Sequence, residues 1–164
     1  MIYFSLGGSG GGGGSSASAN IIMGYSASST WGYAKAPSTA FDYIENTDMR
    51  FVNDAWCSDV GDNTPWLQIF TPSGVILKKI IIKVFSNYYG AWTGNIKITA
   101  SEDGIDFVDL TEAESVTAPF QVFDTHEFNF VNDTAYKYYR IQGTSAFGVN
   151  GYASCFFDQV EAYT

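Results

Sequence analysis

Alternation of apolar and polar residues with a period of two is the feature that most narrows the folds open to this chain. Residues 80–84 read Ile-Ile-Ile-Lys-Val, and residues 95–100 and 127–130 alternate in the same way. We find no convincing stretch with a helical period. Because successive side chains of a strand point to opposite faces, each segment predicts a strand with one buried and one solvated face.

Turn-forming residues divide the rest of the chain into further short strands. Strands are predicted at residues 66–70, 121–123, 136–142 and 154–163, and turns at Pro72-Ser-Gly74, Glu102-Asp-Gly104 and Asn132-Asp133. About eight short strands with turns at this frequency predict an all-β fold. An antiparallel β-sandwich or jelly roll is favoured over an α/β fold.

The N-terminal residues differ in composition from the rest and predict a separate segment. Residues 7–14 contain seven glycines and one serine, and no charged residue occurs before Lys35. Residues 1–20 are therefore predicted to be a Gly/Ser-rich arm or linker, and residues 21–164 a single sandwich domain. The arm is either flexible or packed as polyglycine between neighbouring chains. Its GxSxG and GxGxxG matches follow from composition, because no strand and helix flank them.

Charge and composition exclude several partners. The chain carries 17 acidic against 8 basic residues, a net charge of −9, which repels nucleic acids and anionic membrane surfaces. Aromatic residues make up 17% of the chain, and an acidic, aromatic-rich surface suits neutral polyols and divalent cations. Neither a secretory signal nor an apolar run of transmembrane length is expected. Cys57 and Cys155 are either buried thiols or a bridge between two strands.

The residues give no support for catalysis, so the chain is not expected to be an enzyme. His126 is the only histidine and alternates with apolar residues as a strand residue does. The acidic residues cluster in turns, where solvation explains them, rather than as a catalytic pair. Trp56 and Trp66 are predicted core residues, and Arg140 is predicted to pair with a carboxylate.

A set of short strings, in this order, resembles the discoidin family, also called the coagulation factor 5/8 type C or galactose-binding-like domain. This family includes many bacterial carbohydrate-binding modules. The strings are Ala40-Phe-Asp42, Trp56-Cys-Ser58, Pro65-Trp-Leu-Gln-Ile69, Ile80-Ile-Ile82 leading to Trp92, Ile96-Lys-Ile-Thr-Ala-Ser-Glu-Asp-Gly104, Tyr138-Tyr-Arg-Ile141 and Phe157-Asp-Gln-Val-Glu-Ala-Tyr163. The resemblance covers residues 22–164.

The resemblance implies a jelly-roll sandwich that binds ligands through the loops at one end and often carries structural calcium. The calcium ligands it implies are Asp42 and Glu161, and Asp48 is added as a nearby oxygen donor. The chain departs from the family pattern where Asp42 is followed by Tyr43 instead of glycine, before a longer segment at residues 44–55.

Aromatic residues in segments predicted as loops are the candidate ligand-binding residues, because exposed rings are costly unless they contact a partner. They are Trp31, Tyr33, Tyr88, Tyr89, Trp92, Phe147 and Tyr152. Trp92 is alternatively a residue that packs beneath its loop. Tyr88, Tyr89 and Tyr152 lie beside glycine or asparagine and are either binding residues or ordinary surface residues.

The resulting hypothesis is a non-catalytic, lectin-like module that attaches to cell-surface glycans. The uncharged start of the chain suggests display on a phage virion, as a tail or capsid fibre, with residues 1–34 forming a homotrimer or contacting other virion proteins. The expected location is the virion surface or the extracellular space. One alternative is a structural assembly protein that binds no sugar. Another is a module excised from a secreted bacterial glycoside hydrolase or adhesin.

Overall fold

The computed structural model describes residues 24–30, 37–41, 55–59, 61–84, 92–118, 124–144 and 156–164. Within these residues the chain forms ten strands and one short 3-10 helix. They are β1 (Gly24–Ala27), η1 (Pro37–Phe41), β2 (Trp56–Cys57), β3 (Trp66–Val75), β4 (Lys79–Val84), β5 (Trp92–Ser101), β6 (Val108–Asp109), β7 (Glu114–Ala118), β8 (Asp124–Asn129), β9 (Tyr136–Gly143) and β10 (Phe156–Tyr163). No helix in the described part of the chain is long and apolar enough to cross a membrane.

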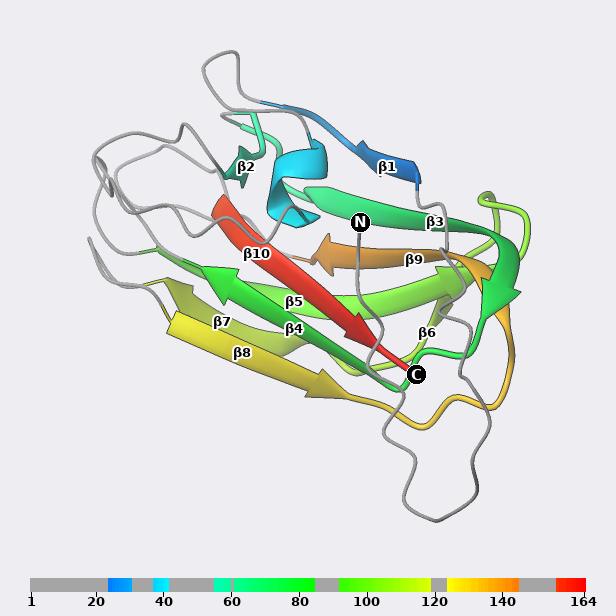
Figure 1. Cartoon of the computed structure of the whole chain (residues 1–164). Coiled ribbons are helices and arrows are strands. Elements are labelled where there is room, and N and C mark those ends of the chain that lie inside the picture. Colours follow the sequence, from blue (N-terminus) through cyan, green and yellow to red (C-terminus); the bar gives the residue numbers. More distant parts are fainter. Residues whose placement is uncertain are drawn as a thin grey trace, which may run out of the picture.

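Two antiparallel sheets form a sandwich, which confirms the predicted all-β fold (Figure 1). The larger sheet has the order β1-β3-β9-β5-β6, and β7 pairs with the other end of β5. The smaller sheet has the order β2-β10-β4-β8. The predicted strand at residues 121–123 lies outside the described residues, as do residues 1–20.

The alternating segments at residues 80–84 and 127–130 bury one face each, as predicted, whereas in residues 95–100 the expected solvated face is incomplete, because Thr99 is only 1% exposed. In β4, Ile80, Ile82 and Val84 are fully buried, whereas Ile81 and Lys83 are half-buried on the opposite face. Burying each apolar side chain contributes roughly 1.5–3 kcal/mol. The inner faces of both sheets contribute to one continuous hydrophobic core.

Two aromatic side chains of the core also carry polar groups, and both are hydrogen-bonded. Trp56 is fully buried as predicted, lies 5.3 Å from the Phe157 ring, and donates from Nε1 to the Ser29 carbonyl at 3.1 Å. Tyr139 in β9 is also fully buried and donates its hydroxyl proton to the Val75 carbonyl at 2.6 Å. These bonds satisfy polar groups that would otherwise destabilise the core.

The predicted turn at residues 102–104 connects β5 to β6 and shows why the sequence has aspartate followed by glycine there. The Asp103 carboxylate accepts hydrogen bonds from the backbone N–H groups of Ile105 and Asp106 at 2.8 and 3.0 Å. These bonds lower the pKa of Asp103. Gly104 adopts a φ of 79°, a left-handed conformation that glycine adopts without steric penalty.

Candidate functional site

One end of the sandwich collects the strand termini that flank the predicted binding segments (Figure 1). The strand registers place the ends of β1, β4, β7 and β9 beside the starts of β3, β5, β8 and β10. Residues 85–91 join β4 to β5, residues 145–155 join β9 to β10, and residues 28–36 follow β1. We call this end of the sandwich the loop end.

Six of the seven predicted ligand-binding aromatics belong to segments attached to the loop end. They are Trp31, Tyr33, Tyr88, Tyr89, Phe147 and Tyr152, and all six lie outside the described residues. The structure therefore shows where the segments that contain these aromatics join the strands. The role of the six aromatics in ligand binding stays a prediction. Trp92 was predicted in a loop, and this was wrong: it is the first residue of β5 and pairs with Ala118 of β7.

A hydrogen-bond network holds the start of one of these segments against the neighbouring connection. The Asp62 carboxylate accepts hydrogen bonds from the hydroxyls of Ser28 and Ser29, both at 2.6 Å. The Ser28 hydroxyl oxygen in turn accepts a hydrogen bond from the backbone N–H of Trp66 at 3.0 Å. The Ser29 hydroxyl oxygen accepts one from the backbone N–H of Asp59 at 3.1 Å. Charge-assisted bonds of this kind are stronger than neutral ones, so Asp62 fixes the point from which residues 31–36 depart.

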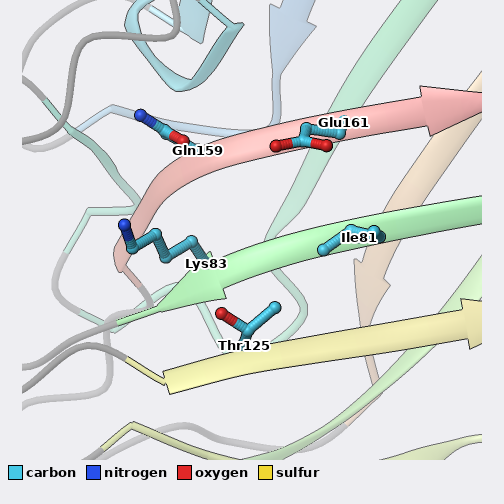
Figure 2. Close-up of a pocket in the computed structure, with 5 residues that line it drawn as sticks. All are labelled: Ile81, Lys83, Thr125, Gln159 and Glu161. Carbon is cyan, nitrogen blue, oxygen red and sulfur yellow. The ribbon is translucent and has the colours of Figure 1, made fainter. Parts of the chain in front are cut away.

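A polar pocket lies on the outer face of the smaller sheet, near the loop end (Figure 2). Its volume is about 170 Å³, and its walls come from three adjacent strands. The lining residues are Ile81 and Lys83 from β4, Thr125 from β8, and Gln159 and Glu161 from β10. Of these residues, only Glu161 was predicted from the sequence to be a site residue. The other four come from strands far apart in the sequence, and only the sheet register brings them together.

Of the three predicted calcium ligands, only Glu161 is described. It is half-buried in β10, lines the pocket, and accepts a hydrogen bond from the Tyr163 hydroxyl. Asp42 and Asp48 lie outside the described residues. No group of three or more His, Cys, Asp or Glu side chains that could hold a metal occurs within the described residues. A second carboxylate of β10, Asp158, is fully buried beside a β-bulge.

Among the described residues, Arg140 on the outer face of the larger sheet contacts an amide and two aromatic rings and not the carboxylate that was predicted. Its Nε donates to the Gln68 carboxamide at 2.8 Å, and its Cζ lies 4.2 Å from the Trp66 ring centroid and 3.7 Å from that of Phe107. Burial lowers the pKa of this guanidinium. Trp66 is half-buried on the outer face. It had been predicted as a core residue, and that prediction was wrong.

His126 lies in β8, as the alternation predicted. Its Nε2 is 3.2 Å from the Thr117 carbonyl oxygen and 3.4 Å from the Asp124 carboxylate. A backbone carbonyl and a carboxylate are ordinary partners for a histidine side chain on a strand. Cys57 is buried, with its thiol 3.2 Å from the Ser58 carbonyl oxygen, whereas Cys155 lies outside the described residues.

Comparison with known proteins identifies the family. The sequence profile of the F5/8 type C domain matches residues 24–157. No curated protein matches the chain. Solved structures with the same fold include chitosan-binding module 1 from a Paenibacillus sp. IK-5 chitosanase/glucanase, with 19% identity, a TM-score of 0.63, and coverage of 88% of this chain and 96% of that chain.

Two further similar structures come from Clostridium perfringens and were solved with sugars. The module CpGH89CBM32-5, in complex with GalNAc-β-1,3-galactose, is 17% identical, with a TM-score of 0.62 and coverage of 87% of this chain and 95% of that chain. The family 32 module of NanJ, in complex with galactose, is 17% identical, with a TM-score of 0.56 and coverage of 85% and 92%. The TM-scores show a shared fold, and the profile match establishes the family: the chain belongs to the F5/8 type C domain family.

Proposed function

We propose that this chain is a non-catalytic carbohydrate-binding module that binds cell-surface glycans at its loop end. The observation that carries the proposal is the topology, because the strand termini flanking six candidate aromatics meet at one end of the sandwich. Solved modules of the same fold, in complex with galactose and GalNAc-β-1,3-galactose, support it.

The chemistry of the segments fits a sugar better than other ligands. Aromatic rings pack on the C–H faces of sugar rings, and neutral hydroxyls avoid the repulsion that a net charge of −9 imposes on anions. A single site of this kind binds weakly, so the proposed module gains useful affinity when several copies act together.

A glycan-array screen with variants from two separate segments tests the proposal. Trp31 lies in the segment after β1, and Tyr152 in the segment before β10. If both segments form a single site at the loop end, the Trp31→Ala and Tyr152→Ala variants should lose signal for the same glycans. Ile105→Ala is the control, because this side chain is 81% exposed in the turn after β5, away from the loop end. Silence of the wild-type protein across a broad array would move the proposal to the assembly role without sugar binding.

We further propose that residues 1–34 display the module on a phage virion. The glycine run and the absence of charge before Lys35 support an arm that packs between chains. Light scattering of the full chain tests this, because a fibre tip is expected to be a stable trimer. A monomer would favour the module of a larger secreted enzyme or adhesin.

We also propose a structural calcium between the segment after η1 and β10. Asp42 directly follows η1, and η1 packs against β10. Oxygen donors from carboxylates are the ligands that calcium prefers. The structure describes two carboxylates of β10 that could supply a further ligand, the predicted Glu161 and the fully buried Asp158.

Thermal melting with and without chelator distinguishes these carboxylates. Calcium bound to the native state raises the melting temperature by ligand linkage. Glu161→Gln is expected to abolish the effect of chelator if Glu161 is the ligand from β10, and Asp158→Asn to abolish it if Asp158 is. If chelator leaves the melting temperature of the wild-type protein unchanged, the calcium proposal fails.

A further inference from the structure

We infer that the pocket on the outer face of the smaller sheet is a second saccharide subsite, which takes a single neutral sugar ring. The ligand class rests on the proposed function, whereas the residues that line the pocket belong to the strands β4, β8 and β10. Its volume of about 170 Å³ is smaller than the roughly 300–1,000 Å³ of sites for drug-sized ligands. The pocket thus fits one ring of a longer glycan.

Gln159 is the residue that points to a ligand. It is only 9% exposed, lines the pocket, and its carboxamide forms no hydrogen bond within the described part of the chain. The polar atoms of this carboxamide are not among the buried atoms that lack a partner, so they are accessible from the pocket and can meet a ligand there. A bound hydroxyl group would supply the missing donor and acceptor.

Other polar groups on the same sheet face already have partners, so the pocket is not simply one more part of a wet surface. Lys79 lies 3.7 Å from the Glu127 carboxylate and 4.5 Å from the centroid of the Tyr163 ring. Glu127 also accepts a hydrogen bond from Asn129 at 2.8 Å. Because Lys79 and Glu127 engage one another, the part of this face that is left open to a ligand is the pocket beside Gln159.

The register explains why a depression forms there. Lys83 is opposite Thr125 on one side and Gln159 on the other, and Ile81 is opposite Glu161. A bulge between Phe157 and Gln159 shifts the register of β10, and such bulges re-aim the neighbouring side chains. Neighbouring strands lie about 4.8 Å apart, so three strands span roughly 10 Å. This width suits one sugar ring rather than an oligosaccharide.

The donor and acceptor set matches a neutral sugar. Lys83 supplies donors, Glu161 accepts, and Gln159 and Thr125 can do both. Ile81 offers an apolar surface for the C–H groups of the ring (Figure 2). One positive and one negative side chain in the same pocket disfavour a phosphate or another multiply charged anion.

An NMR titration of the full-length protein labelled with ¹⁵N tests the inference. The probes are D-galactose and N-acetylglucosamine at millimolar concentrations. Saturable shifts are expected for the Gln159 side-chain amide and for backbone amides of residues 81–83, 125 and 159–161. These shifts should persist in a Tyr88→Ala/Tyr89→Ala variant, because neither residue is among those that line the pocket.

Matched variants assign the response to the pocket. Gln159→Met keeps the side-chain length and removes the carboxamide, and it is expected to weaken binding about threefold to tenfold. Thr125→Val removes an exposed hydroxyl with little risk to folding and should weaken binding to a similar extent. Gln142→Met is the control, because Gln142 is half-buried in β9 of the other sheet.

The result separates this inference from the proposed function. Shifts confined to the loop-end segments, with none on β10, β4 or β8, would overturn the second subsite and leave the proposed function intact. Equal affinity in the Gln159→Met, Thr125→Val and Gln142→Met variants would also overturn it. Absence of any saturable shift with both probes would overturn it as well, and the glycan array decides the proposed function independently.

Discussion

Tyr139→Phe removes one hydroxyl from the best-satisfied buried polar cluster of the fold. That hydroxyl donates to the Val75 carbonyl at 2.6 Å and accepts from the Leu77 backbone N–H and the Asn132 side chain, both at 3.2 Å. Asn132 keeps its bond to the Leu77 carbonyl at 3.0 Å in the variant, but the Leu77 N–H loses its acceptor. Leu77 is fully buried, so water cannot readily replace that bond.

The expected loss follows from these bonds. An unsatisfied buried donor costs about 1–3 kcal/mol, and the lost bond to Val75 adds about 1 kcal/mol. We therefore expect the free energy of unfolding to fall by about 2–4 kcal/mol, and the melting temperature by roughly 5–15 °C. Urea titration and thermal melting followed by circular dichroism measure both quantities.

Tyr136→Phe is the matched control, because Tyr136 packs edge-on against Tyr139 with ring centroids 6.1 Å apart. Its hydroxyl makes no hydrogen bond within the described residues, so the change should be within about 0.5 kcal/mol. An equally small effect for Tyr139→Phe would refute the reasoning.

The same residue predicts a pH dependence. Burial raises the pKa of the Tyr139 hydroxyl, so the folded state disfavours its ionisation. The stability contributed by this group is fully present below its unfolded pKa of about 10 and is lost as the pH rises through the folded pKa. The stability difference between wild type and Tyr139→Phe should accordingly narrow above pH 10.

Three further predictions concern the surface and the proposed metal. Arg140→Lys loses planar stacking on two aromatic rings and a hydrogen bond, and should lower the free energy of unfolding by about 1–2 kcal/mol in a urea titration. Gly104→Ala should destabilise the protein more than Gly61→Ala, although both glycines have a positive φ. A Cβ at Gly104 would lie 3.1 Å from the Tyr138 ring, whereas a Cβ at Gly61 would meet nothing within 4 Å. Equal effects would contradict that contact. Chelator should lower the melting temperature of the wild-type protein, and no shift would exclude stabilisation by calcium.

Strong alternation made the central strands predictable, and weak alternation hid the others. Residues 80–84 place three apolar side chains on one face, so β4 could be predicted directly from the sequence. β7 reads Glu-Ser-Val-Thr-Ala, and only Val116 is buried among its residues with described side chains. β1 has only four residues, all half-buried, and is defined by its pairing with β3. Pairing between distant segments is not encoded in local periodicity.

The incorrect surface predictions have a common physical reason. Trp66, Gln68 and Phe70 alternate with Leu67 and Ile69, so the sequence offers two apolar faces. The polar Gln68 indicates which face is wet, and Trp66 shares that face. Cross-strand register then places Arg140 opposite Gln68, which supplies an amide oxygen where a carboxylate was predicted.

The candidate site was predictable in part. Aromatic residues beside glycine and asparagine predicted the segments of the loop end, and the topology brings the termini of those segments together. The pocket was not predictable, because Lys83, Thr125 and Gln159 give no local signal and meet only through strand register. Asn132 was predicted as an ordinary turn residue, but it is 5% exposed and its side chain bonds to Leu77 and Tyr139.

The most direct test of glycan binding at the loop end is titration calorimetry with the glycan that gives the strongest array signal. Wild-type protein and the Tyr88→Ala/Tyr89→Ala variant are compared, after circular dichroism shows that both are folded. We predict saturable binding by the wild type and at least about tenfold weaker binding by the variant, a difference of about 1.4 kcal/mol. Equal affinity in the two proteins, or no saturable heat for the wild type, would contradict the account.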